Sequence, residues 1–128
     1  MSSQHILVVD DEPLIVQSIK DFLMMKRDLY KVSTAYNGKE ALDIIKEKKV
    51  DLIILDLNMP VLDGISAMQQ LRDRDFHEPI VALTANATQE DKKRCLNAGA
   101  DNFVVKPVDV SVFYNTLSQY LPEKPVIE

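Results

Sequence analysis

The stretch LIILDLNMP, residues 52–60, runs four consecutive apolar residues directly into Asp56. An uninterrupted aliphatic run of this length is typical of a strand that is buried on both faces, as in the centre of a parallel sheet. Asp56 therefore stands at the carboxyl end of a strand that its surroundings hold rigidly. We interpret the run as the support of one carboxylate, whose purpose depends on what lies at the ends of the neighbouring strands.

Four further runs resemble this one in length and in their content of branched aliphatic residues. With DLIIL (51–55), the set is HILVV (5–9), YKVSTA (30–35), PIVAL (79–83) and NFVV (102–105). Apolar residues at helical spacing predict helices at 13–26, 37–49, 64–74, 87–100 and 110–121. Five alternations of strand and helix predict an α/β fold with a doubly wound parallel sheet, in which the mixed run 30–35 suits an edge. The helix at 87–100 has few large apolar residues, so we expect it to pack only weakly against the sheet.

The composition describes one domain with a conventional core. The chain has 128 residues, of which 46% are hydrophobic, and we expect a domain at 1–121 followed by a Pro-containing tail or linker at 122–128. Cys95 has no partner for a disulfide, which favours a reducing, cytoplasmic location, and the N-terminus does not look like a signal peptide. No apolar run suits membrane insertion. A net charge of −5 argues against direct binding of nucleic acid.

Polar residues stand where the predicted strands end. The first strand ends in Asp10 and Asp11, the third in Asp56, the fourth in Thr84 and the fifth in Lys106. Parallel strands end at the same edge of a sheet, where open α/β sheets bind their ligands. Adjacent strands are about 4.8 Å apart, so three carboxylates would meet if the first and third strands are neighbours.

Carboxylates brought together in this way repel one another and favour a hard divalent cation. An oxygen-only ligand set suits Mg²⁺, and Mn²⁺ would serve similarly. Lys106, about 10 Å from Asp56 across two strand spacings, could bridge that distance with its long side chain, and Thr84 adds a hydroxyl. Together these groups form an anion site suited to a phosphoryl group, with Asp56 as a nucleophile that would form an acyl phosphate.

Four motifs at these strand ends make the chain resemble the receiver domain of two-component response regulators over nearly its whole length. They are VVDDEP (8–13), LDLNMPVLDG (55–64), ALTANA (82–87) and NFVVKP (102–107). The resemblance implies a flavodoxin-like sheet of order 2-1-3-4-5 with five helices. It also implies a phosphoacceptor signalling switch, either a stand-alone regulator or the receiver of a hybrid histidine kinase, and not an enzyme beyond its own phosphorylation and slow dephosphorylation.

The same resemblance assigns roles to individual residues. Asp56 would be the phosphorylated residue; Asp11 and Asp56 would bind Mg²⁺ directly, Asp10 mostly through water, and Asn58 through its backbone carbonyl. Thr84 and Lys106 would contact the phosphoryl oxygens. Two further features of the family are a cis peptide at Lys106–Pro107 and an aromatic switch residue, here Phe103, that turns inward when Thr84 moves.

The resemblance also implies the partners. The phosphoryl donor would be a phosphohistidine on a histidine kinase or on a histidine-phosphotransfer protein. Phosphorylation would remodel the face formed by the helix 87–98, the strand 102–105 and the last helix, where a downstream partner binds and where a phosphorylation-dependent dimer can form. Asn58 and Asn86 lie at positions that tune the lifetime of the aspartyl phosphate.

Other interpretations remain open at the level of sequence. Asp10 and Asp11 could simply cap the helix that follows them, Phe103 could be an ordinary core residue, and His5 and Cys95 are best explained structurally. An aspartyl-phosphate phosphohydrolase of the haloacid-dehalogenase type is a rival function, although it needs a second Asp where this chain has an Asn. A binding-only pseudo-receiver is another rival, and three scattered glycines argue against a nucleotide-binding Rossmann domain.

Overall fold

The computed structural model describes residues 4–25, 30–59, 62–85 and 88–120. In these ranges five strands alternate with five helices, and the sheet is parallel with the order β2-β1-β3-β4-β5. The predicted fold class and strand order are therefore confirmed. The elements are β1 (Gln4–Val9), α1 (Pro13–Met24), β2 (Tyr30–Ala35), α2 (Gly38–Glu47), β3 (Leu52–Asp56), α3 (Gly64–Asp73), β4 (Ile80–Thr84), α4 (Gln89–Ala98), β5 (Asn102–Val105) and α5 (Val110–Leu117).

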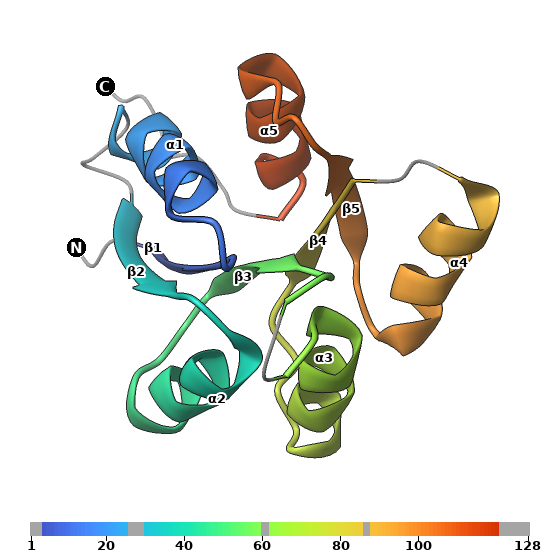
Figure 1. The fold of residues 1–128 in the computed structure, drawn as a ribbon. Coiled ribbons are helices and arrows are strands. Elements are labelled where there is room, and N and C mark those ends of the chain that lie inside the picture. Colours follow the sequence, from blue (N-terminus) through green and yellow to red (C-terminus); the bar gives the residue numbers. More distant parts are fainter. Residues whose placement is uncertain (1–3, 26–29, 60–61, 86–87, 121–128) are drawn as a thin grey trace.

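Helices cover both faces of the sheet (Figure 1). Helices α1 and α5 lie on one face, while α2, α3 and α4 lie on the other. Side chains of a strand alternate between the two faces, so Ile6 and Val8 pack under α1 and α5 while Leu7 and Val9 pack on the opposite side. Every residue of β3 and of β4 is buried, whereas the edge strand β2 is buried only at its two ends. No helix in the described ranges is long and apolar enough to cross a membrane.

The predicted element boundaries lie within two residues of the observed ones, except at the end of α5. This helix ends at Leu117 and not at 121. The Ser118 hydroxyl donates a hydrogen bond to the carbonyl of Asn115, a local bond that competes with helix continuation. Residues 121–128, including the predicted tail, lie outside the described residues.

Helix α4 has less apolar anchoring than the other helices. Its only buried side chain is Cys95, whereas α3, of the same length, buries Gly64, Ala67, Met68 and Leu71. Thr88 caps its start by accepting a hydrogen bond from the backbone N–H of Asp91 at 3.1 Å. The weak anchoring predicted from the sequence is therefore confirmed.

The carboxyl end of α4 is held by one side chain from α3. Gly99 ends the helix with a positive φ of 124°, and a Cβ at this position would lie 2.8 Å from Arg72 Cγ. Arg72 donates hydrogen bonds from Nε and Nη2 to the carbonyl of Gly99, at 3.1 and 2.7 Å. Its Nη1 donates to the carbonyls of Phe76 and Glu78, and its Nη2 also pairs with Asp101 at 3.0 Å. One guanidinium thus joins the ends of α3 and α4 to the start of β4.

We expect Arg72→Lys to destabilise the protein by about 1–3 kcal/mol, because an ammonium cannot reproduce the rigid fork of five donors. Arg74, exposed at the end of the same helix, provides the matched control, and Arg74→Lys should change stability by less than about 0.5 kcal/mol. Urea unfolding of the two variants would measure the difference. Equal effects would show that the hydrogen bonds of Arg72 contribute little.

Candidate functional site

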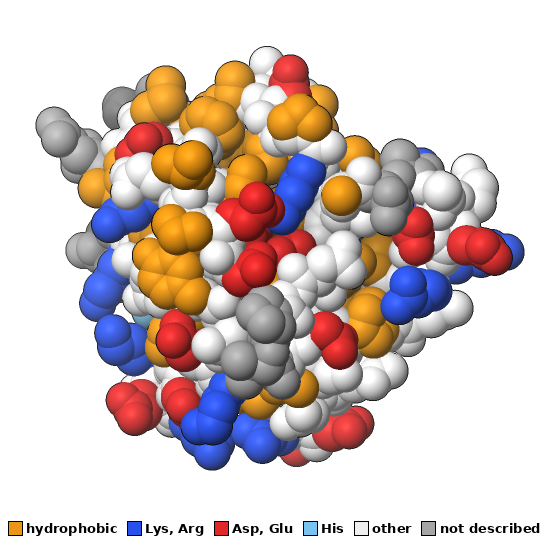
Figure 2. All heavy atoms as spheres, in the orientation of Figure 1, with side chains coloured by type: hydrophobic (Ala, Val, Ile, Leu, Met, Phe, Trp, Pro, Cys, Tyr) orange, Lys and Arg blue, Asp and Glu red, His pale blue; other side chains and the backbone are white. Residues whose placement is uncertain are grey.

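Three carboxylates meet where β1 and β3 end. Val9 pairs with Leu55 in the parallel register, so the residues that follow them, Asp10 and Asp56, are neighbours across the two strands. Asp11 lies next to them, and each of the three acids offers an oxygen within 4.8 Å of the others. Asp10 is fully buried and Asp56 is 2% exposed, while Asp11 is exposed. Figure 2 shows acidic side chains gathered near the centre of this face, beside a basic one.

Lys106 reaches this cluster from the end of β5. Its Nζ lies 2.9 Å from Asp10 Oδ2, 3.4 Å from Asp56 Oδ1 and 3.3 Å from Glu12 Oε1. The backbone N–H of Lys106 donates to the carbonyl of Thr84 at 2.8 Å, which fixes the start of the side chain against β4. The ammonium therefore spans the distance across β4 and β3 that the sequence suggested. The peptide bond from Lys106 to Pro107 is cis.

Backbone hydrogen bonds orient the two buried carboxylates. Asp10 Oδ1 accepts from the N–H of Glu12 at 3.0 Å, and Asp56 Oδ1 accepts from the N–H of Asn58 at 3.2 Å. Helix α1 has Glu12 at its N-cap position without any side-chain capping bond, so neither Asp10 nor Asp11 caps this helix. The capping interpretation of the two acids is therefore wrong.

Burial and charge perturb the titration of this cluster. Burial, together with the neighbouring Asp10 carboxylate, raises the pKa of Asp56 from 3.8 to about 6, although Asn58 and Lys106 act in the opposite direction. Burial alone would lower the pKa of Lys106, but contacts with Asp10, Asp56 and Glu12 raise it above its usual value. Lys106 is therefore a permanent cation, and it offsets only part of the repulsion between the acids.

The donor set fits a hard divalent cation. Asp10 Oδ2 is buried and forms an ion pair with Lys106 Nζ at 2.9 Å. A buried carboxylate oxygen inside a cluster of three acids is a suitable ligand for Mg²⁺ or Mn²⁺. The candidate ligand atoms in the cluster are all carboxylate oxygens, which disfavours a soft metal.

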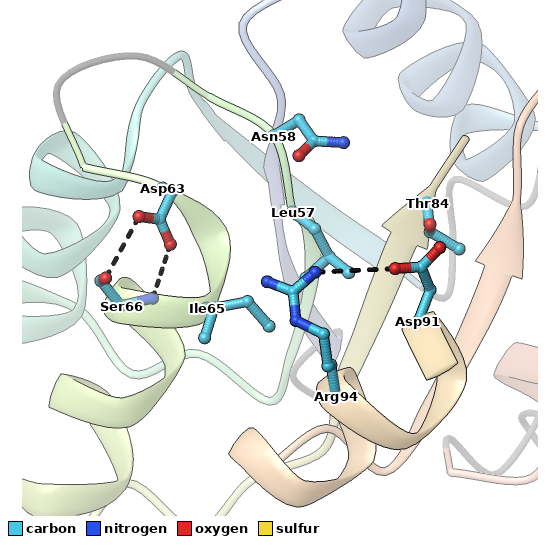
Figure 3. A pocket seen from close by; sticks show the side chains of 8 residues that line it. All are labelled: Leu57, Asn58, Asp63, Ile65, Ser66, Thr84, Asp91 and Arg94. Atoms are coloured by element: carbon cyan, nitrogen blue, oxygen red, sulfur yellow. Dashed lines mark hydrogen bonds and ion pairs between the residues drawn. The ribbon is translucent and has the colours of Figure 1, made fainter. Parts of the chain in front are cut away.

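A polar pocket of about 390 Å³ lies between the carboxyl ends of β3 and β4 and the helices α3 and α4 (Figure 3). Asn58 and Thr84 border it on the side of the strands. Asp63 and Ser66 come from the N-terminal end of α3, and Asp91 and Arg94 come from α4. The remaining lining residues are apolar: Leu57 and Ile65. The pocket therefore lies between the ends of two central strands and the most weakly anchored helix.

Some residues of the site gave no signal in the sequence. Glu12 is a third acidic partner of Lys106, a role that was not predicted from the sequence. Gly64 allows α3 to begin against β3, because a Cβ at this position would lie 2.2 Å from the carbonyl oxygen of Asp56. Glu12 directly follows the acidic pair in the sequence, and this position could have indicated its role. The role of Gly64 depends on a close approach of two backbone segments, which only the structure reveals.

The remaining predicted residues are also placed, with one exception. Phe103 is half-buried, packs against the core cluster beneath α2, α3 and α4, and has Lys92 Nζ 5.2 Å from its ring centre. His5 is buried and donates through Nδ1 to the carbonyl of Lys49 at 2.7 Å, in agreement with a structural role. Asn86 lies outside the described residues.

Cys95 fits the structural explanation given to it from the sequence. Its side chain is fully buried in the core cluster beneath α4, and burial raises the pKa of the thiol. A high pKa reduces the fraction of thiolate, which is the nucleophilic form. Cys95 is thus a packing residue of α4.

Comparison with known proteins gives a consistent result. Residues 6–118 match the family model described as the response regulator receiver domain. The sensor histidine kinase RcsC of Salmonella typhimurium is 38% identical over 115 residues, which are 90% of this chain and 12% of RcsC. The transcriptional regulatory protein PrrA of Mycobacterium leprae is 42% identical over 107 residues, 84% of this chain and 45% of PrrA. The chain thus spans less than half the length of either relative.

Solved structures share the fold at similar levels of identity. The receiver domain of sensor histidine kinase PA1611 from Pseudomonas aeruginosa has a TM-score of 0.83 and 33% identity, covering 93% of this chain and 98% of that one. It is described with a magnesium ion coordinated in its active-site cleft. The receiver domain of Ssk1 from Saccharomyces cerevisiae, solved with the histidine phosphotransfer protein Ypd1, has a TM-score of 0.86 and 30% identity, covering 98% of this chain and 94% of that one.

The raised pKa of Asp56 predicts how stability depends on pH. The folded protein binds this proton more tightly than the unfolded chain, so its contribution to stability is fully present below pH 3.8 and is lost as the pH rises through about 6. Without metal at pH 7.5, Asp56→Asn should therefore be more stable than the wild type by about 1–3 kcal/mol, and the difference should shrink toward pH 4.

Urea unfolding in the presence of a chelator, repeated across this pH range, would measure the difference. Asp73→Asn, which changes an exposed carboxylate on α3, is the control for loss of charge alone. A difference that does not depend on pH, or a variant less stable than the wild type at pH 7.5, would contradict the proposed electrostatics.

Proposed function

The chain belongs to the response regulator receiver domain family, and we propose that it is a phosphoacceptor switch in which Asp56 receives a phosphoryl group. The donor is a phosphohistidine on a histidine kinase or on a histidine-phosphotransfer protein. The observation that carries the proposal is the arrangement of Asp56, which is buried at the end of a central strand between two further acids and the ammonium of Lys106. The partner named with the Ssk1 receiver supports this class of donor.

In the proposed reaction an oxygen of the Asp56 carboxylate attacks the phosphorus of the donor. A new O–P bond forms while the N–P bond breaks, and the imidazole nitrogen leaves with the electron pair of that bond. Asp56 must be ionised to attack, and a pKa of about 6 leaves it mostly ionised at neutral pH. The donor imidazole carries a proton on its other ring nitrogen, so the products are an aspartyl phosphate and a neutral histidine.

The residues around Asp56 would position the reactants and neutralise charge. Lys106 already lies within ion-pair distance of Asp56, so its ammonium can bind an oxygen of the incoming phosphoryl group. Thr84 ends the adjacent strand and would donate its hydroxyl to another oxygen. Asp10, Asp11, Asp56 and the backbone carbonyl of Asn58 would hold Mg²⁺, which when bound supplies positive charge to the phosphoryl oxygens. Mn²⁺ has the same preference for oxygen ligands.

The output of the switch would be a change in the face formed by α4, β5 and α5. Phosphorylation draws Thr84 toward the new phosphoryl group, and Phe103 then moves into the space beside it. Helix α4 can respond because Cys95 is its single buried residue. A downstream partner, or a second copy of the chain in a phosphorylation-dependent dimer, would bind the altered face. Direct contact with nucleic acid is not part of this proposal.

The rival functions agree less well with the site. A phosphohydrolase of the haloacid-dehalogenase type needs an acid two residues after the nucleophile, and Asn58 has no carboxyl group. A binding-only module has no need for Lys106 within 3.4 Å of a buried Asp56. We therefore propose phosphoryl acceptance and slow self-dephosphorylation, without turnover of a separate substrate, in a cytoplasmic protein.

The larger protein in which this domain acts can be of two kinds. RcsC is a sensor histidine kinase and PrrA is a transcriptional regulatory protein, and this chain is similar to part of each. We propose that the domain works either as a stand-alone regulator or as the receiver of a hybrid kinase. In both cases the signal would leave through a partner that binds the phosphorylated domain.

Acetyl phosphate with Mg²⁺ should add a single phosphoryl group to the wild-type protein and none to Asp56→Asn, as measured by intact mass. The adduct should require Mg²⁺, because the acids and Lys106 alone leave the repulsion between the incoming phosphate and the carboxylates largely uncompensated. Asp73→Asn is the control for a general change in charge and should be phosphorylated like the wild type. An adduct that persists in Asp56→Asn would show that another residue is the acceptor.

Amide exchange should locate the response to phosphorylation. The amides of α4 should exchange faster than those of α3, which has the same length but four buried residues, and phosphorylation should change exchange in α4 far more than in α3. Hydrogen–deuterium exchange on the protein with and without the aspartyl phosphate would measure both effects. Identical exchange in α4 in the two states would exclude this helix as the moving element.

A further inference from the structure

Helix α4 carries a cation on the side that faces the sheet. Lys92 Nζ lies 5.2 Å from the centre of the Phe103 ring, and both side chains are half-buried. Cys95, one turn later on the same side, is the single buried residue of the helix. By helical periodicity, the position of Lys92 is therefore one where an amphipathic helix normally has an apolar residue.

An aromatic ring is a suitable partner for a cation in this position. The face of the ring carries negative potential, and a lysine within about 6 Å of its centre is attracted to it. Phe103 itself packs against the core cluster beneath α3 and α4, so the contact joins a weakly anchored helix to the edge strand β5. We infer that the contact contributes to the position of α4 on the sheet.

The two ends of α4 differ in how firmly they are held. Its carboxyl end is fixed by the hydrogen bonds from Arg72 to the carbonyl of Gly99. Its first half borders the pocket of about 390 Å³ through Asp91, and Arg94 lines the same pocket from the middle of the helix, as Figure 3 shows. Movement of this half toward the pocket would displace few packed atoms, so the contact of Lys92 with Phe103 is well placed to oppose it.

We propose that Lys92 is a positioning residue of the switch: it holds the Phe103 ring against α4 in the unphosphorylated protein and thereby opposes the phosphorylated state. This proposal rests on the phosphoacceptor function proposed above. A contact present in one state and broken in the other shifts the equilibrium between them by its own strength. For an accessible cation–ring contact, the shift is about two- to fivefold.

A competing explanation is that the lysine serves only through its aliphatic stem. Lysine side chains often cover apolar surface with their methylene groups while the ammonium stays in water. Lys92→Met keeps a flexible apolar stem and removes the charge, whereas Lys92→Arg keeps the charge. Lys93, the next residue of α4, is exposed, so Lys93→Met is the matched control for loss of one positive charge near the site.

The test is the affinity of each variant for beryllium fluoride in the presence of Mg²⁺, a mimic of the phosphoryl group, measured by titration calorimetry. Lys92→Met should bind the mimic about two- to fivefold more tightly than the wild type, because the unphosphorylated state has lost its stabilising contact. Lys92→Arg and Lys93→Met should both bind like the wild type. Equal tightening in Lys92→Met and Lys93→Met, or none in either, would overturn the proposal.

A second measurement separates this proposal from the function on which it rests. A double-mutant cycle of Lys92→Met and Phe103→Leu, followed by urea unfolding without any phosphoryl mimic, measures the contact itself. The two substitutions should be coupled by about two- to fivefold in the unfolding equilibrium, and additivity would overturn the role of Lys92. If the cycle shows coupling but no variant binds the mimic, the phosphoacceptor function fails while the contact remains.

Discussion

The arrangement of this protein depends on the proximity of two buried carboxylates, Asp10 and Asp56, at the ends of adjacent central strands. Two like charges about 4 Å apart cost roughly 4 kcal/mol at the effective dielectric constant of a protein surface, and burial adds a cost of desolvation. Burial, and after it the neighbouring Asp10 carboxylate, raises the pKa of Asp56 to about 6. The other groups of the site either offset this repulsion with positive charge or hold the two carboxylates in place.

The rigid sheet holds these acids close together despite their repulsion. β3 and β4 are buried along their whole length, and helices cover both faces, so the strand ends cannot move apart to relieve the repulsion. Lys106 supplies one positive charge within 3.4 Å of both acids, and it remains charged because those acids raise its pKa. A single ammonium leaves a net negative cluster, which is the condition under which a divalent cation, and then a phosphoryl group, becomes favourable.

Much of this could be predicted from the sequence, because the relevant information is local. Continuous aliphatic runs identify central strands, and the residue that follows each run must lie at the edge where parallel strands end. Asp10, Asp56, Thr84 and Lys106 were found in this way. Contacts between elements distant in the chain could not be found so readily. Arg72 binds carbonyls at the end of another helix, and no periodicity or motif marks it for that role.

The contact of Lys92 with Phe103 is a second one that could not be predicted from the sequence. In the sequence KKRC (92–95), charge alone does not say which lysine turns toward the sheet. The phase of α4 is set by Cys95, a small residue that gives a weak apolar signal, and only the structure shows Lys92 above Phe103.

Weak anchoring of α4 and strong anchoring of the strands both suit the switch proposed above. A site that keeps like-charged carboxylates close together must have a rigid backbone at those residues, because a flexible backbone would let the carboxylates move apart. A segment that reports on the site must be stabilised so little that one new contact can change its position. Helix α4 meets this condition because one buried residue, an arginine at one end and a cation–ring contact hold it in place. The few polar contacts that hold α4 are therefore the places where its response can be adjusted without disturbing the sheet that carries the site.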